Sequence, residues 1–193
     1  MDNIRYLTMT ELLAAEAEIR RSPADAGELK LIVRRPAVDV REMLQAGELS
    51  FEEGLAGDTW KTRGSSSMPD GSSNPDAQLA IMNARVVSLL AQDSARWQLA
   101  GDQLFIDLDL SKENLPAGTR VALGDAVIEI TGEIHSGCKK FAARFGLDAL
   151  AFISAPERKD LRLRGIYAKV VQPGRVRVGD TARRIALSPD AVS

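Results

Sequence analysis

The stretch Thr119-Arg-Val-Ala-Leu-Gly-Asp-Ala-Val-Ile-Glu-Ile-Thr131 places two apolar-rich runs on either side of Gly124-Asp125. Residues 126–131 alternate apolar and polar side chains, which is the period of a strand with one buried face. A Gly-Asp pair between two such runs is typical of a tight hairpin. The stretch therefore predicts strands over 119–123 and 126–131, joined by a two-residue turn.

Beyond this hairpin, the same patterns predict several more short elements. The predicted strands cover residues 29–33, 78–82, 104–110 and 165–171, with a closing hairpin of 175–178 and 181–187 around Gly179-Asp180. The predicted helices cover residues 10–21, 40–46, 84–91, 93–99, 139–145 and 147–154. Many short strands with Gly and Pro turns, and few long helices, predict a mainly β chain with short helices (α+β), folded as a closed or nearly closed β-barrel.

The length of 193 residues is enough for one sizeable core. We expect an N-terminal helical arm over residues 1–26, a barrel domain over 27–187 and a tail over 188–193. Residues 63–76 are rich in Ser, Pro, Gly and Asp, and predict a flexible surface loop inside the barrel domain. The amphipathic helix of the arm would allow a homodimer.

The composition excludes some classes of protein and favours others. With 25 Lys and Arg against 27 Asp and Glu, the formal charge of -2 argues against nucleic-acid binding through general electrostatics. Arginine outnumbers lysine by 18 to 7, which favours recognition of small anionic groups. One cysteine cannot close an intrachain disulfide, and the sequence has neither a signal-peptide pattern nor a membrane-length apolar run. These features predict a cytoplasmic protein with no membrane partner.

The single cysteine and single histidine lie three positions apart, at Cys138 and His135, and Lys139 and Lys140 follow at once. A strand, a glycine-containing turn and the start of a helix would place the Cys138 sulfur near unpaired backbone N–H groups. Together with nearby cations, these groups would stabilise a thiolate. The favoured hypothesis is therefore a reactive or metal-ligating sulfur, and the alternative is a small packed side chain.

Two further segments carry side chains that could hold an anion beside Cys138. One is the turn Lys112-Glu113-Asn114, and the other is the basic run 158–165 with Arg162 and Arg164. We expect one of these arginines to point inward and the three segments to meet at one mouth of the barrel. Arg34 and Arg35, in contrast, predict a solvated strand end.

A series of motifs runs in order between Leu29 and Ile185: Gly54-Leu-x-Gly57-Asp58, Gln78 to Asn83, Gly101-Asp102, Asn114-Leu-Pro-x-Gly118-Thr119, Gly124, Thr131 to Cys138 with Phe141 and Phe145-Gly146, Arg164-Gly-x-Tyr-Ala-x-Val-Val171, Gly174 and Gly179-Asp180. This set resembles the MOSC domain, a family named after the C-terminal domain of molybdenum cofactor sulfurases. The family fold is rich in β-barrel structure. The resemblance implies molybdenum-cofactor binding, sulfur carriage and an association with pyridoxal phosphate.

The resemblance also implies roles for individual residues. Cys138 matches the family cysteine that ligates molybdenum or carries a persulfide, and a thiolate suits both roles because it is a soft, nucleophilic ligand. In cofactor-binding relatives such as the amidoxime-reducing proteins, a Ser-x-Cys and an Arg-x-Asn turn contact the pterin cofactor. Ser136-x-Cys138 matches the first. Lys112-x-Asn114 matches the second with lysine in place of arginine, which keeps the charge and loses the bidentate fork. Further candidates to hold the cofactor are Lys139, Arg162 and Arg164.

The leading hypothesis is a MOSC-type protein that binds a molybdenum–pterin cofactor, or carries sulfur as a Cys138 persulfide for delivery to a metal–sulfur centre. It would be a sulfur transferase or an oxidoreductase component, supplied by a donor such as a cysteine desulfurase or working with a redox partner. Two alternatives stay open. One is a non-catalytic barrel that binds a phosphorylated ligand, and the other is a cysteine hydrolase or transferase with His135 as base.

Overall fold

The computed structural model describes residues 5–185 of the chain. Its helices are α1 (Met9–Ile19), α2 (Trp60–Arg63), η1 (Pro75–Ala77), α3 (Ala84–Ala91), η2 (Ser94–Ala100), α4 (Lys139–Phe145), α5 (Leu147–Ser154) and η3 (Pro156–Leu161). Its strands are β1 (Ala26–Arg34), β2 (Glu42–Leu44), β3 (Ala46–Ser50), β4 (Gly54–Leu55), β5 (Leu79–Asn83), β6 (Leu104–Asp107), β7 (Arg120–Leu123), β8 (Ala126–Ile130), β9 (Ile166–Gln172), β10 (Gly174–Arg177) and β11 (Thr181–Ile185).

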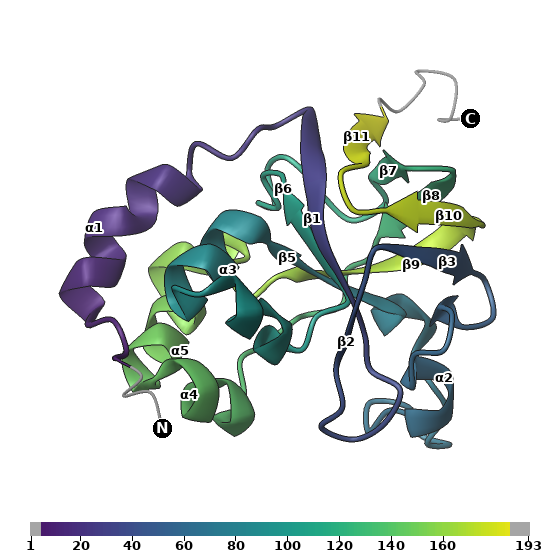
Figure 1. The fold of residues 1–193 in the computed structure, drawn as a ribbon, viewed down its shortest axis with the longest axis horizontal. Coiled ribbons are helices and arrows are strands. Elements are labelled where there is room, and N and C mark those ends of the chain that lie inside the picture. The colour runs from purple at the N-terminus through teal and green to yellow at the C-terminus, as the bar shows by residue number, and fades with distance from the viewer. Residues whose placement is uncertain (1–4, 186–193) are drawn as a thin grey trace.

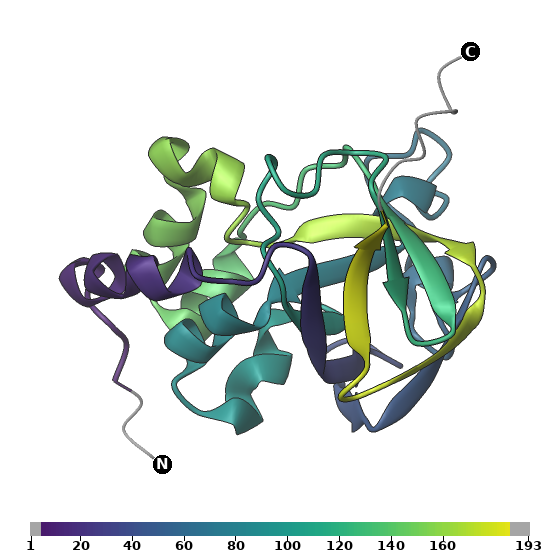
Figure 2. The same ribbon diagram turned by 90° about the horizontal axis from the view of Figure 1, so that it is seen from above.

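Seven strands close into a mixed β-barrel, which confirms the predicted fold class. The strands follow the order β11-β7-β8-β9-β5-β6-β1, and β1 pairs back onto β11 to complete the ring. Figure 2 shows β1 and β11 side by side at this seam. Every neighbouring pair is antiparallel except β5 and β6, which are parallel and are joined by a crossover through α3 and η2. The short strand β2 extends the sheet beyond β1, and β10, β3 and β4 form a separate three-stranded sheet.

The strands on the helical side of the barrel bury both faces. In β5 all five residues are buried, as expected for a strand with the barrel core on one side and helices on the other. Ile81 points into the barrel core, whereas Met82 joins a second core beneath the helices. Phe105 of β6 also belongs to the second core, where it packs beside Trp97 with ring centroids 6.3 Å apart.

The longer helices α1, α3, α4 and α5 lie together on one side of the barrel, as both ribbon views show (Figure 1). Helix α1 begins at a capping box, in which Thr8 and Glu11 exchange hydrogen bonds. Its apolar residues Leu12 and Ile19 are buried within this chain. No helix among residues 5–185 is long and apolar enough to cross a membrane.

Two predicted elements are wrong. Residues 40–46 contain β2 and the start of β3 in place of the expected helix, because pairing of Glu42–Leu44 with β1 outweighs the local helix preference. Gly179-Asp180 does not close a hairpin. The strand β10 before it pairs with β3, and the strand β11 after it pairs with β7 and β1, so this turn is a corner between two sheets. Leu187 and the expected tail 188–193 lie outside the described residues.

Candidate functional site

Cys138 stands at the end of an extended segment that follows β8, in the position of the α4 N-cap. Its backbone carbonyl accepts hydrogen bonds from the N–H groups of Phe141 and Ala142, whereas its side chain makes no capping bond and is exposed. Helix α4 is anchored by Phe141 and Phe145, whose buried rings pack 4.8 Å apart between centroids. The sulfur is therefore held on a fixed helix start and is open to solvent.

Cys138 opens onto a cavity of about 390 Å³ between the barrel rim, α4 and the segment that follows α2. We call it the Cys138 cavity, and its polar lining includes Arg35, Arg63, His135, Cys138, Lys140, Arg144, Arg164 and Tyr167. Its volume lies within the range of roughly 300–1,000 Å³ that is usual for small-molecule sites. A ligand of cofactor size with several anionic groups suits such a lining.

Two of the lining arginines, Arg35 and Arg164, are each paired with a fully buried carboxylate. Arg35 holds Asp58 with both Nε and Nη2 at 2.8 Å. Arg164 Nη1 lies 2.7 Å from Oδ2 of Asp102, whose side chain is 0% exposed. Burial raises the pKa of Asp102 and the nearby Arg164 opposes that rise. Arg164 also lies over the Phe141 ring, at 5.1 Å from its centroid, so its guanidinium is fixed from two sides.

The other three lining cations, Arg63, Lys140 and Arg144, are less fully paired with carboxylates. Lys140 and Arg144 share one carboxylate, Asp39, at 3.5 and 3.4 Å. Within residues 5–185, no carboxylate lies within 4.0 Å of the Arg63 guanidinium, and its pKa is lowered by burial and by the nearby Arg35. Five lining cations thus face three carboxylates, so the cavity has a surplus of positive charge that favours an anionic ligand.

His135 lies deep in the same cavity wall. Its side chain is 7% exposed, and its ring packs on Tyr167 with 4.4 Å between centroids. Its Nδ1 atom is 3.5 Å from Asp102 Oδ1 and has no hydrogen-bond partner among the described residues. Burial, with Arg164 and Arg35 adding to it, lowers the pKa of His135 well below 6.5. The imidazole is therefore neutral at pH 7.

A second cavity, of about 550 Å³, lies next to the first. We call it the Ser136 cavity, and its lining includes Lys112, Glu133, Ile134, His135, Ser136, Ile153, Ser154, Lys159, Asp160, Arg162, Leu163, Arg164 and Ile166. His135 and Arg164 line both cavities, so these two side chains form a shared wall. Ser136 and Cys138, although two residues apart, open onto different cavities.

The predicted site residues therefore fall into separate groups. Lys112, Ser136, Arg162 and Arg164 meet at the Ser136 cavity, so segments from three parts of the chain do converge there. Arg164 is the predicted inward arginine, since it is paired with buried Asp102. Arg162 donates from Nη1 to the carbonyl of Leu115 at 2.7 Å, which fixes its guanidinium at the rim.

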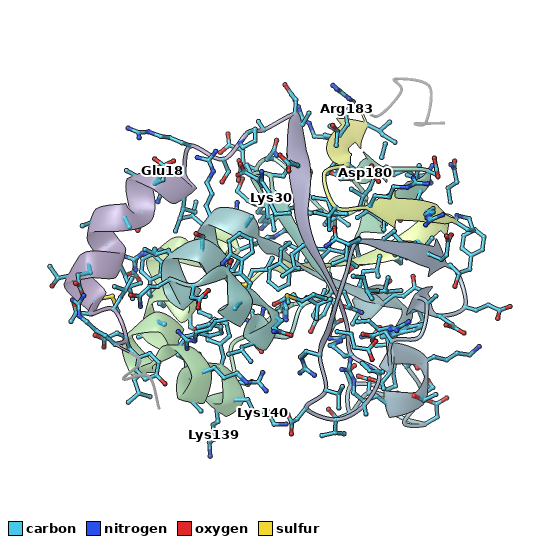
Figure 3. All side chains as sticks on the ribbon, viewed as in Figure 1. Glu18, Lys30, Lys139, Lys140, Asp180 and Arg183 are labelled. Atoms are coloured by element: carbon cyan, nitrogen blue, oxygen red, sulfur yellow. The ribbon has the colours of Figure 1, made fainter. Side chains whose placement is uncertain are left out.

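Two other predicted residues are placed differently. Asn114 is buried, and its Nδ2 donates to the carbonyls of Ala24 at 2.9 Å and Asp109 at 2.8 Å. This amide holds backbone segments together, and a contact with a cofactor stays a prediction. Lys139 is exposed, and Figure 3 shows its side chain pointing away from the body of the molecule at the start of α4.

Sequence reasoning missed two of the five cations of the Cys138 cavity, Arg35 and Arg63. Arg35 was expected at a solvated strand end, and this expectation is wrong because the side chain is buried against Asp58. Arg63 lies in the segment that was predicted only as a flexible loop, yet it lines the cavity. The available signal was the Gly57-Asp58 turn. A buried acidic residue there requires a partner, but the sequence does not say which arginine provides it.

The protein ligands for a metal are few. Among residues 5–185, no group of three His, Cys, Asp or Glu side chains could hold a metal ion. A metal bound by Cys138 must therefore bring most of its ligands with it, as part of a larger cofactor. The surplus of positive charge around Cys138 fits a cofactor that carries anionic groups.

Comparisons with known proteins agree with this architecture. The fold is similar to the crystal structure of the YuaD protein from Bacillus subtilis, with a TM-score of 0.59 and 16% identity, over 84% of this chain and 97% of that one. It is also similar to YiiM from Escherichia coli, with a TM-score of 0.52 and 18% identity, over 84% of this chain and 72% of that one. No curated protein sequence matches the chain. The family model for the MOSC domain matches residues 69–183, which is more than half of the sequence. The chain therefore belongs to the MOSC domain family.

Proposed function

We propose that this protein binds a molybdenum–pterin cofactor in the Cys138 cavity, with the Cys138 sulfur as a ligand of the metal. The observation that carries the proposal is an exposed thiol on a cavity with more cationic than anionic side chains. A thiolate suits a thiophilic metal, and fixed guanidinium groups suit the anionic end of a phosphorylated cofactor. When bound, the cofactor would supply a redox-active metal centre.

Different lining residues would make different contacts with the cofactor. Arg63 would contact the cofactor's phosphate, because it is the lining arginine without an ion-pair partner among the described residues. Lys140 and Arg144 would share their charge between Asp39 and the ligand. Arg35 and Arg164 would act mainly by position, because each is already held by a buried carboxylate. The other predicted contacts, from Ser136, Lys112 and Arg162, would require a ligand that extends into the neighbouring cavity.

The exposed thiol supports sulfur carriage as a second form of the same function. The Cys138 thiolate would attack the outer sulfur of a donor persulfide, such as that of a cysteine desulfurase. The donor's S–S bond would break, the donor would leave as a thiolate, and Cys138 would hold the sulfur as a persulfide. The surplus of cations would attract the anionic persulfide of the donor to the cavity. A redox partner would be required only if the bound metal cycles between oxidation states.

One observation favours a different candidate, a cysteine-dependent transferase or hydrolase. His135 lines the same cavity as Cys138 and is neutral, the state in which an imidazole accepts a proton. Activity of this kind should collapse in His135→Ala. Cofactor loading should survive the same substitution, because no cofactor contact is assigned to His135.

The test is the molybdenum content of protein purified without air from a host that makes the cofactor. Wild type, Cys138→Ala and Arg63→Gln would be compared with Lys139→Gln, a matched control for loss of one exposed cation. We expect near-stoichiometric molybdenum in wild type and in the control, loss in Cys138→Ala and reduced loading in Arg63→Gln. Full loading of Cys138→Ala would overturn the assignment of the ligand.

If molybdenum is lacking in wild type as well, the cofactor proposal fails. Treatment with a persulfide donor, followed by mass measurement of the intact chain, then tests sulfur carriage. A gain of one sulfur atom in wild type and none in Cys138→Ala would support the carrier. No gain in either would leave a binding barrel for a phosphorylated ligand, with Cys138 as a bystander.

A further inference from the structure

We propose that the Ser136 cavity is a second ligand site, distinct from the Cys138 cavity, and that it takes a small monocarboxylate with an apolar body. The cavity has a volume of about 550 Å³, within the range of roughly 300–1,000 Å³ for small-molecule sites. The 132–137 segment separates it from the Cys138 cavity. The proposal does not depend on a cofactor being bound beside Cys138.

The net charge of the lining indicates how many negative charges the ligand carries. Lys112, Lys159 and Arg162 face the cavity, and no carboxylate among residues 5–185 lies within 4.0 Å of any of them. Glu133 and Asp160 also line it and offset two of the three charges. Arg164 is neutralised by Asp102. The balance is one surplus positive charge, which matches a carboxylate better than a doubly charged phosphate.

The apolar part of the lining indicates that the ligand has an apolar body. Ile153, Leu163 and Ile166 are almost fully buried and contribute to the wall of the cavity. Ile134, on the 132–137 segment, is 75% exposed at the same cavity. An exposed isoleucine at a cavity rim can bury its side chain against an apolar ligand. The free energy of this burial then favours the bound state.

Polar groups remain available to fix the carboxylate. The hydroxyls of Ser136 and Ser154 line the cavity and make no side-chain hydrogen bond to the described residues. The shared wall places the bound ligand against His135, whose ring also faces the Cys138 cavity. Binding should therefore be visible in the resonances of the protein's single imidazole as well as in those of the 132–137 backbone.

The experiment is an NMR titration of nitrogen-15-labelled full-length protein with three probes. Benzoate carries one charge on an apolar ring, benzyl alcohol carries none, and phenyl phosphate carries about two at pH 7. We expect benzoate to shift the amides of residues 132–137 saturably. The neutral alcohol and the doubly charged ester should each bind at least about threefold more weakly, the scale of one exposed charge contact.

Substitutions locate the site. The variant Lys159→Gln should weaken benzoate binding by about threefold, whereas Lys139→Gln should leave it unchanged. Ile134→Asp, at an exposed position that should not disturb folding, should weaken it further by placing a carboxylate at the rim.

Four results would overturn the proposal. They are the absence of saturable shifts, equal affinity for benzyl alcohol, shifts centred on residues 63–66, and lowered molybdenum loading in the Lys159→Gln variant. The last would make both cavities one cofactor site. Cys138→Ala separates the two proposals, since it should lose molybdenum while benzoate binding persists.

Discussion

Acidification should destabilise the fold through one side chain. His135 is the only histidine of the chain, and it is 7% exposed. Burial, with Arg164 and Arg35 adding to it, lowers the pKa of this imidazole well below its ordinary 6.5. The unfolded chain therefore takes up a proton at pH values where the folded chain does not. Stability from this residue is present above pH 6.5 and is lost as the pH falls below it.

The size of the effect follows from this difference in proton uptake. If the folded imidazole stays neutral over this range, lowering the pH from 7 to 5.5 reduces the free energy of unfolding by on the order of 1 kcal/mol. Asp102 acts in the opposite direction, since burial raises its pKa and the folded state then binds the extra proton. The variant His135→Gln retains Asp102, so the difference between the two proteins isolates the imidazole.

The assay is urea unfolding of wild type and His135→Gln at several pH values between 7 and 5.5. The free energy of unfolding should fall with acidification more steeply in wild type, by the amount given above. Because the chain has one histidine, its ring protons also give an unambiguous NMR titration. The reasoning is refuted if the folded imidazole titrates near 6.5, or if the two proteins respond equally to pH.

Three further predictions concern local features of the fold. Thr8→Ala removes the α1 cap and should cost about 1 kcal/mol, seen as faster amide exchange in the first turn of α1. Gly27→Ala would bring a Cβ to 1.8 Å from the Asp107 carbonyl oxygen and should lower stability in thermal unfolding by well over about 1 kcal/mol. Gly132→Ala, with 3.9 Å to its nearest neighbour, is the matched control, and equal losses would contradict the steric argument. Arg164→Met leaves buried Asp102 unpaired and should cost about 3–5 kcal/mol in urea unfolding. The pair Arg164→Met/Asp102→Leu should recover much of that loss, and a double variant as unstable as the single one would argue against the buried charge as its cause.

Local patterns were sufficient for most of the secondary structure. The hairpin at Gly124-Asp125 joins β7 to β8, as predicted from the alternation on either side. The same dipeptide at Gly179-Asp180 failed as a hairpin signal. A Gly-Asp pair specifies a tight turn, but the partners of the flanking strands depend on distant segments. Here those segments are β3 for one strand and β1 and β7 for the other.

In the candidate site, too, features set by neighbouring residues could be predicted, whereas features set by the packing of distant segments could not. The position of Cys138 at a helix start could be predicted, because the strand, turn and helix are contiguous in sequence. The separation of Ser136 from Cys138 could not, because it depends on how residues from distant segments, such as Arg63 and Lys112, pack on the two sides of the 132–137 segment. The burial of Arg35 depended on Asp58, which lies on a turn three strands later in the sequence.

The seam between β1 and β11 has a consequence for biosynthesis. Its pairs, such as Ala26 with Arg183 and Glu28 with Thr181, join the earliest strand of the barrel to the latest. While the ribosome is still adding residues, β7 has no neighbour on the side that β11 will occupy, and the barrel stands open as a curled sheet. We therefore expect barrel closure to come late in folding during synthesis, and the nascent chain to be most prone to aggregation before it.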